Sequence, residues 1–178
     1  MTARAIFLDR DGVLILHHIR DGRPFSITAG EEAELFDGVR EACSELAALG
    51  NLLVMVTNQP EVAVGKIPRH FVEETNDWLT RELGLDDVEV CFHDDTVDCA
   101  CRKPKPGMLL NAASKLGLDL GASVMVGDRW RDIAAGKAAG CRTVLVDHGY
   151  TDRAPEPADH AVPSLWAAMP WFRTLPLP

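Results

Sequence analysis

Three aspartates lie at the ends of short apolar runs. Asp9 and Asp11 follow the run from Ala3 to Leu8, and Asp128 follows the run from Ser123 to Val126. Three carboxylates brought close together repel one another unless a cation neutralises them, and Mg²⁺ prefers oxygen ligands while leaving room for water and phosphate. A carboxylate can also attack phosphorus and divide a hydrolysis into two easier steps. Each aspartate alone could be a turn residue, but together they predict metal-assisted phosphoryl chemistry.

A second group of residues has the composition of a metal site. Cys91 and His93 are followed, after five intervening residues, by Cys99 and Cys101. Three thiolates and one imidazole make a closed tetrahedral set for Zn²⁺ with no open position, which predicts a structural zinc and not a catalytic one. Disulfides are the alternative, but Cys99 and Cys101 are too close in sequence to bridge easily, and one cysteine would be left over. The other two cysteines, Cys43 and Cys141, fit small buried residues.

These residues need elements that hold them in place, and the sequence predicts alternating strands and helices. Apolar runs predict buried strands at 3–8, 52–56, 88–92, 123–126 and 143–146, and helical spacing predicts helices at 38–49, 68–83, 107–116 and 131–139. Such alternation predicts a doubly wound α/β fold with a parallel sheet, in which ligands bind beyond the carboxyl ends of the strands. Thr57 and Asn58 also lie at such an end.

The remaining segments and the composition limit the alternatives. The stretch before Phe36 predicts a loop with a short hairpin, and the proline-rich tail predicts loose packing apart from a short helix near Leu165. No repeat or second domain is evident, so residues 1–178 are expected to form a single domain. The net charge of -9 argues against nucleic acid or an anionic membrane as partner, without excluding a small phosphorylated metabolite. No apolar run or leader indicates a membrane or export, so we expect a cytoplasmic monomer.

Four motifs in order resemble those of the haloacid dehalogenase superfamily of phosphatases. They are Phe7-Leu8-Asp9-Arg10-Asp11-Gly12-Val13, Val56-Thr57-Asn58-Gln59, Arg102-Lys103-Pro104-Lys105-Pro106-Gly107 and Val126-Gly127-Asp128-Arg129-Trp130-Arg131-Asp132. The resemblance spans nearly the whole chain, from about Ile6 to Val146. It implies a Rossmann-like sheet of the haloacid-dehalogenase type and phosphomonoester hydrolysis through an aspartyl-phosphate.

The resemblance also implies roles for individual residues. Asp9 would be the nucleophile, and Asp11 the general acid and base. Mg²⁺ would be held by Asp9, the backbone carbonyl of Asp11, and Asp128. Thr57 would hydrogen-bond the phosphoryl oxygens, and Lys103 would balance the negative charge. Asp132 stays open: it could steady Lys103 or the waters on the metal, or cap the following helix.

The cysteine pattern narrows the resemblance to a zinc-loop branch. A Cys-x-His…Cys-x-Cys loop at 91–101, directly before Arg-Lys-Pro, resembles the branch that contains D-glycero-D-manno-heptose-1,7-bisphosphate phosphatases and bacterial histidinol-phosphate phosphatases. In that branch the loop walls the substrate pocket and replaces a large cap domain. The short segment between Asp11 and the helix at 38–49 fits a protein without such a cap.

Several positions depart from the heptose enzymes. Val64 stands where an arginine is expected, Glu61 adds a negative charge, and the loop from Leu14 to Ile27 is unlike the expected short one. Its His17 and His18 are expected to be surface residues and not ligands.

The substrate therefore has more than one candidate. A sugar bisphosphate of the heptose type comes first, with Asn58, Arg102 and Arg129 as substrate-binding residues and Arg131 near them, because guanidinium groups suit a second phosphate. Histidinol phosphate is the alternative, since Glu61 could receive its ammonium. A catalytically inactive relative that binds a phosphorylated ligand is the non-enzyme alternative, and a receiver-like signalling domain is disfavoured by the zinc loop.

Overall fold

The computed structural model describes residues 3–151, 153 and 156–176. Its centre is a six-stranded parallel sheet in the order β5-β4-β1-β6-β7-β8. The strands are β1 (Ala5–Leu8), β4 (Leu52–Asn58), β5 (Asp87–Cys91), β6 (Val124–Gly127), β7 (Arg142–Val146) and β8 (His160–Val162). The predicted α/β fold is confirmed, and five of these strands match the predicted apolar runs to within two residues.

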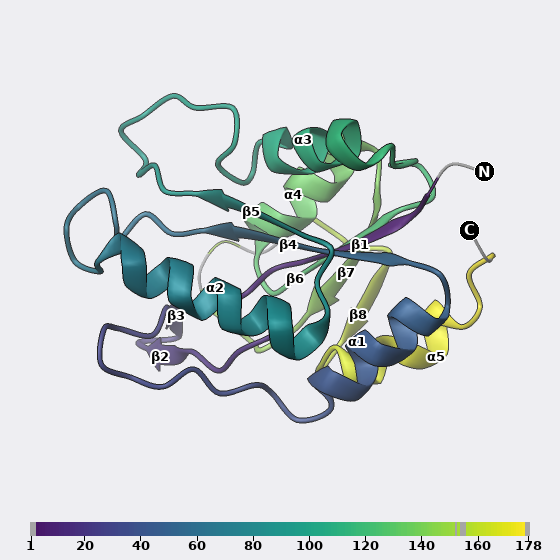
Figure 1. Cartoon of the computed structure of the whole chain (residues 1–178), viewed down its shortest axis with the longest axis horizontal. Helices are drawn as coiled ribbons and strands as arrows, with labels where there is room; N and C mark the ends of the chain where they lie inside the picture. Colours follow the sequence, from purple (N-terminus) through teal and green to yellow (C-terminus); the bar gives the residue numbers. More distant parts are fainter. Residues whose placement is uncertain (1–2, 152, 154–155, 177–178) are drawn as a thin grey trace.

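Helices cover both faces of the sheet. On one face lie α1 (Val39–Ala48), α2 (Arg69–Leu83), the short 3-10 helix η1 (Trp166–Ala168) and α5 (Met169–Phe172), and on the other lie α3 (Gly107–Leu116) and α4 (Trp130–Ala139) (Figure 1). Side chains of β1 alternate between two cores: Ile6 and Leu8 pack with the first set of helices, and Phe7 packs with the second. Burial on both faces explains why the strands are continuous apolar runs.

A small hairpin stands where a cap domain could have been inserted. Strands β2 (His18–Arg20) and β3 (Arg23–Phe25) pair antiparallel and form a sheet of their own. The hairpin predicted in this loop is therefore confirmed. Residues 14–38 add no larger unit than this hairpin, in agreement with the absence of a large cap.

The prediction of a loosely packed tail was wrong. Strand β8 pairs in parallel with β7 and extends the sheet, and the side chains of Leu165, Met169 and Phe172 are buried in the core. The prolines do not prevent this, since Pro163 follows β8 and Pro170 lies in the first turn of α5, where no backbone N–H is needed. Two other tail prolines, Pro155 and Pro178, lie outside the described residues.

The order of the strands creates the place for a site. From β1 the chain continues to β4 on one side, and β6 lies on the other side, so the connections diverge at the carboxyl end of β1. A crevice at such a switch point is where α/β sheets bind ligands. In the described part of the chain, no helix is long and apolar enough to cross a membrane.

Candidate active site

A pocket opens at the carboxyl ends of β1, β4 and β6, where the polar motifs were predicted to meet. The β2–β3 hairpin, the segment after β4 and the segment before α3 add to its walls. Its lining consists of Asp9, Asp11, Pro24, Ser26, Asn58, Pro60, Glu61, Arg102, Lys103, Asp128, Arg129, Arg131 and Asp132. Every predicted catalytic and substrate-binding residue except Thr57 is among them.

A buried lysine joins the carboxylates at the bottom of this pocket. Lys103 Nζ lies 2.8 Å from Asp9 Oδ1, 2.6 Å from Asp132 Oδ1 and 2.8 Å from the carbonyl oxygen of Val56. The lysine side chain is only 2% exposed. Asp132 Oδ2 also accepts the backbone N–H of Arg129 at 3.0 Å, at the start of α4. Of the roles left open for Asp132, it therefore has two: it contacts Lys103, and it caps the helix.

The pocket holds more negative charge than this lysine neutralises. One carboxylate oxygen each of Asp9, Asp128 and Asp132 lie within 4.8 Å of one another. Burial raises the pKa of Asp9 to about 7, although Lys103 opposes the shift. Burial, together with the charges of Asp9 and Asp132, raises the pKa of Asp128 well above its ordinary value. Because Oδ1 of Asp128 is buried without a hydrogen-bond partner, the group fits a cation-binding site.

Asp11 is held by two residues to which the motif analysis assigned no role. Its carboxylate accepts Arg10 Nε and Gln59 Nε2, at 3.0 and 2.9 Å. The same Gln59 amide donates to Thr57 Oγ1 at 3.0 Å. Thr57 thus lies buried behind the pocket lining, and its own hydroxyl hydrogen remains to be donated. Both supporting residues belong to the quoted motifs, but sequence alone did not indicate that they contact Asp11.

Asn58 fixes the strand to the lysine segment. Its amide donates to the carbonyl oxygen of Lys103 at 3.0 Å and accepts the N–H of Lys103 at 3.1 Å. One side chain thus makes both backbone hydrogen bonds that a neighbouring strand would have made. The position of Lys103 beneath the pocket depends on this pair.

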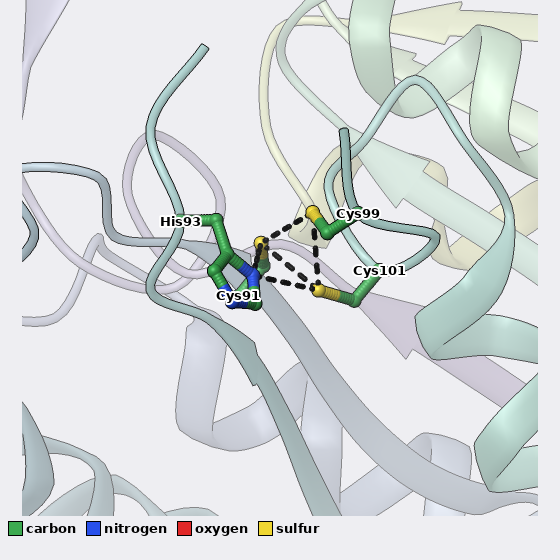
Figure 2. Close-up of side chains that lie close together, drawn as sticks. All are labelled: Cys91, His93, Cys99 and Cys101. Atoms are coloured by element: carbon green, nitrogen blue, oxygen red, sulfur yellow. Dashed lines mark hydrogen bonds between the residues drawn. The ribbon is translucent and has the colours of Figure 1, made fainter. Parts of the chain in front are cut away.

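The four cysteine and histidine side chains converge beside β5, as Figure 2 shows. The sulfur atoms are 3.8 Å apart for Cys91 and Cys99, 3.2 Å for Cys91 and Cys101, and 3.4 Å for Cys99 and Cys101. His93 Nδ1 lies 3.6 Å from Cys91 Sγ and 3.3 Å from Cys101 Sγ. A tetrahedral zinc with bonds of about 2.3 Å needs ligand atoms about 3.8 Å apart, so the cluster fits a closed four-ligand site.

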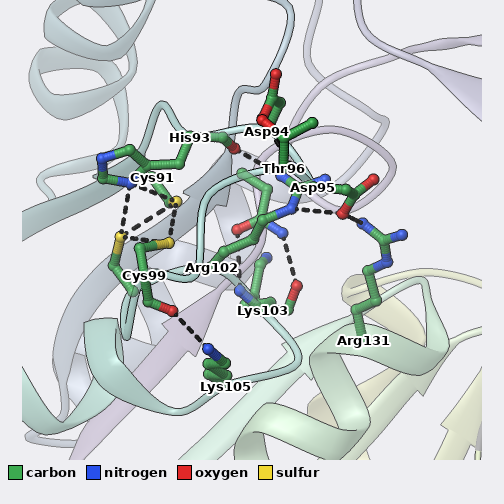
Figure 3. A network of polar contacts seen from close by, with 12 residues as sticks. Cys91, His93, Asp94, Asp95, Thr96, Cys99, Arg102, Lys103, Lys105 and Arg131 are labelled. Atoms are coloured by element: carbon green, nitrogen blue, oxygen red, sulfur yellow. Dashed lines mark hydrogen bonds and ion pairs between the residues drawn. The ribbon is translucent and has the colours of Figure 1, made fainter. Parts of the chain in front are cut away.

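A network of polar contacts connects the cysteine and histidine cluster with residues of the pocket (Figure 3). Arg102, one residue after the last cysteine, donates from Nη1 to the carbonyl oxygen of His93 at 3.1 Å and from Nε to Asp95 Oδ1 at 2.9 Å. The same Asp95 oxygen lies 3.6 Å from Arg131 Nη1. At its other end the loop turns back tightly, and a Cβ on Gly107 would lie 2.2 Å from the carbonyl oxygen of Ala100. The four candidate zinc ligands therefore lie on the segment that orients Arg102 and, through Asp95, contacts Arg131.

The loop after Asp11 differs from the prediction at one residue. His18 is exposed and ion-paired with Glu31, as a surface residue would be. His17 is not a surface residue: it is half-buried, and its ring packs edge-on against Tyr150, with the ring centroids 5.7 Å apart. Tyr150 follows β7 at the same edge of the sheet as the aspartates, and its hydroxyl contacts Asp128. The strand-end rule that identified Asp128 would also have identified this tyrosine, whereas composition and motifs gave no indication of it.

Several known proteins are similar to this chain in sequence or fold. A family model described as HAD-hydrolase-like matches residues 100–168. A D-glycero-β-D-manno-heptose-1,7-bisphosphate 7-phosphatase of Pasteurella multocida is 38% identical over 91% of this chain and 92% of its own length. The enzyme of the same name from Escherichia coli K12 is 40% identical over 90% of this chain and 89% of its own length. A crystal structure of the D,D-heptose 1,7-bisphosphate phosphatase from B. bronchiseptica, complexed with magnesium and phosphate, has a TM-score of 0.81 at 27% identity and covers 96% of this chain and 98% of that one.

The fold, the pocket and these matches define a haloacid-dehalogenase-like hydrolase without a large cap. Within that class, the chain belongs to the family of the D-glycero-β-D-manno-heptose-1,7-bisphosphate 7-phosphatases. It is a phosphoric monoester hydrolase, and the resemblance based on its four motifs and cysteine loop is confirmed. The inactive-relative alternative does not agree with this membership.

The charge balance in the pocket leads to a prediction for stability. Lys103→Met leaves the buried Asp9 and Asp132 carboxylates without their cation, so we expect a loss of about 3–5 kcal/mol in the free energy of unfolding at pH 8. The pKa of Asp9 is already raised in the folded state, so the folded variant takes up protons as the pH falls, and the loss should shrink towards pH 5.5. Urea denaturation of the parent and the variant at both pH values, without added Mg²⁺, measures this loss in the free energy of unfolding.

Lys105→Met is the control, since this lysine belongs to the same segment and is half-exposed beside Asp98. It should change the free energy of unfolding by less than about 1 kcal/mol at either pH. A Lys103→Met protein as stable as the parent at pH 8 would contradict the described charge balance.

Proposed function

We propose that the pocket removes the 7-phosphate of D-glycero-β-D-manno-heptose 1,7-bisphosphate through a phosphorylated Asp9. The observation on which this rests is the buried Lys103 between Asp9 and Asp132, beside Asp128, at the bottom of a pocket whose rim carries arginines. The names of the 38–40% identical relatives support the choice of substrate.

In the proposed reaction, two carboxylates divide the work. An oxygen of Asp9 forms a bond to phosphorus while the bond from phosphorus to the ester oxygen breaks, and Asp11 gives its proton to the leaving oxygen. Asp11 then takes a proton from water, the water oxygen bonds to phosphorus, and the acyl–phosphate bond breaks to release phosphate and restore Asp9. The contacts of Asp11 with Arg10 and Gln59 keep its carboxylate at the pocket wall for both steps.

The other pocket residues position Asp9 and the phosphoryl group and balance their negative charge. Lys103 donates to Asp9 Oδ1 and offsets negative charge on Asp9 and the phosphoryl group, and the backbone N–H of Arg10 donates to the same oxygen at 2.8 Å. Thr57, which accepts from Gln59, donates its hydroxyl hydrogen to a phosphoryl oxygen. Such charge stabilisation and positioning supply most of the catalysis in phosphoryl transfer.

We infer that the residues suit Mg²⁺, held by Asp9, the backbone carbonyl of Asp11, and Asp128. The unpartnered Oδ1 of Asp128 and the three clustered carboxylates support this, as does the magnesium and phosphate complex of the B. bronchiseptica enzyme. When bound, the ion neutralises charge on the phosphoryl oxygens.

We infer that Cys91, His93, Cys99 and Cys101 hold a structural Zn²⁺. The donor set is complete at four ligands, and the three sulfur atoms lie 3.2–3.8 Å from one another, which fits tetrahedral coordination. All five cysteines are free, which suits a reducing cytoplasm.

The rim supports a substrate with a second anionic group. Arg102, Arg129 and Arg131 line the pocket, and Arg102 is nine-tenths buried, so its guanidinium fork is held ready for a phosphate. Val64, at the position where an arginine was expected, is 53% exposed and does not line the pocket. Glu61 does line it, and this is the feature that favours histidinol phosphate as a second candidate.

Replacing the nucleophile should abolish turnover and keep the fold. Asp9→Asn removes the attacking carboxylate, so the rate of phosphate release with Mg²⁺ should fall by more than about 1,000-fold, a barrier increase of about 4 kcal/mol. Asp77→Asn, the same change on the exposed side of α2, should leave the rate unchanged. If Asp9→Asn stays within about tenfold of the parent, Asp9 is not the nucleophile.

Metal analysis separates the two metal sites. Protein purified under reducing conditions should contain about one zinc per chain, whereas activity should depend on added Mg²⁺. Cys101→Ser should lose the zinc, and Cys141→Ala, a change at a buried cysteine outside the cluster, should keep it. Zinc-free parent protein whose Cys91 and Cys99 react freely with an alkylating reagent would contradict the zinc site.

The choice of substrate is tested at the arginines. Arg102→Ala and Arg129→Ala should each lower kcat/KM on the heptose 1,7-bisphosphate about ten- to a hundredfold, because a charge-assisted hydrogen bond to the second phosphate contributes about 1.5–3 kcal/mol. The loss on a matched monophosphate should be much smaller. Equal losses on both substrates would reject the bisphosphate, and faster turnover of histidinol phosphate by the parent would favour the second candidate.

A further inference from the structure

The single tyrosine of the chain connects the candidate metal ligand to a histidine. The Tyr150 hydroxyl donates to Asp128 Oδ2 over 2.6 Å, and the same hydroxyl oxygen lies 2.6 Å from His17 Nε2. A hydroxyl has one hydrogen to donate, so when it is given to Asp128, His17 must be the donor to Tyr150.

The bond from Tyr150 distinguishes the two oxygens of Asp128. Oδ2 accepts the tyrosine hydrogen, whereas Oδ1 is buried with no hydrogen-bond partner. A carboxylate with one oxygen fixed and the other unsatisfied has the orientation of a metal ligand, because such a ligand needs a partner that sets its direction. Tyr150 provides that partner from the segment after β7, whereas Asp128 directly follows β6.

Close packing leaves this pair little freedom. Gly12 has a φ of 84°, and a Cβ there would lie 2.1 Å from Asp128 Oδ2 and 3.2 Å from the Tyr150 hydroxyl. The carbonyl oxygen of Gly12 is 2.7 Å from His148 Nε2. The His148 ring stacks on Phe36 with centroids 5.5 Å apart, and it also lies 5.5 Å from the Tyr150 ring. The tyrosine is thus contacted from two other segments, by Asp128 and by His17, and by His148 of its own segment.

We propose that Tyr150 is a positioning residue that orients Asp128 towards Mg²⁺, and that His17 orients Tyr150 in turn. This proposal rests on the proposed function, because it takes Asp128 as a magnesium ligand. It adds two residues from outside the four motifs, one after β7 and one in the loop that precedes β2. Tyr150 is not among the residues that line the pocket, so its role is exerted through Asp128.

Direct metal binding provides the test. Titration calorimetry of the full chain with Mg²⁺ alone, repeated with Mn²⁺ by electron paramagnetic resonance, measures the affinity without turnover. Tyr150→Phe removes only the hydroxyl and should raise the Kd about ten- to a hundredfold, the usual effect of losing a residue that orients a ligand. His17→Phe should raise it less. His18→Asn, a change at the neighbouring exposed histidine, should leave it unchanged.

Activity supplies a second readout. High Mg²⁺ should restore much of the turnover of Tyr150→Phe, whereas it should not restore Asp128→Asn. A Tyr150→Phe protein that binds Mg²⁺ like the parent, while Asp128→Asn does not bind, would overturn the role of Tyr150 and leave the proposed function intact. If Asp128→Asn itself binds Mg²⁺ like the parent, the metal site of the proposed function fails instead.

Discussion

The ion pairs of Lys103 are the interaction on which the site depends. Parallel strands bring their carboxyl ends to one edge, and here that edge collects three buried aspartates within 4.8 Å of one another. Burial lowers the pKa of Lys103, but the charges of Asp132 and Asp9 raise it by more. The lysine therefore stays charged in the interior. One lysine against three carboxylates leaves an excess of negative charge, and that excess is the physical reason why this group of residues fits a divalent cation.

The cysteine loop contributes to the same charge balance because it leads into two positively charged residues of the pocket. It is the segment between β5 and α3, and it ends directly at Arg102 and Lys103. Arg102 donates to the carbonyl oxygen of His93, one of the four candidate zinc ligands, and Asn58 holds the backbone of Lys103 from the neighbouring strand. The structural zinc proposed for this cluster would have no open position for chemistry, but it would hold the segment that leads into Arg102 and Lys103. In this chain without a large cap, Arg102 and Lys103, which directly follow the cysteine cluster, form part of the pocket lining.

Much of this could be predicted from the sequence because strand ends and motifs are local signals. Asp9, Thr57 and Asp128 were found from apolar runs that end in polar residues, and the four metal ligands from their spacing. The strand-end rule could also have indicated Tyr150, but its contact with Asp128, like that of Gln59 with Asp11, has no local signal because it depends on how side chains from distant segments meet. The sixth strand was missed because prolines around it resembled loop signals, although they lie where no backbone N–H is required.

The central claim is that Asp9 becomes phosphorylated during turnover, and trapping the acyl-phosphate tests it most directly. Protein quenched while hydrolysing the heptose 1,7-bisphosphate, then reduced with borohydride, should contain homoserine at position 9 when its peptides are analysed by mass spectrometry. Reduction converts only the activated acyl group and leaves free carboxylates unchanged. Homoserine at position 9 in the substrate-treated sample alone is the predicted result. An unmodified Asp9, or homoserine at another aspartate, would contradict the account.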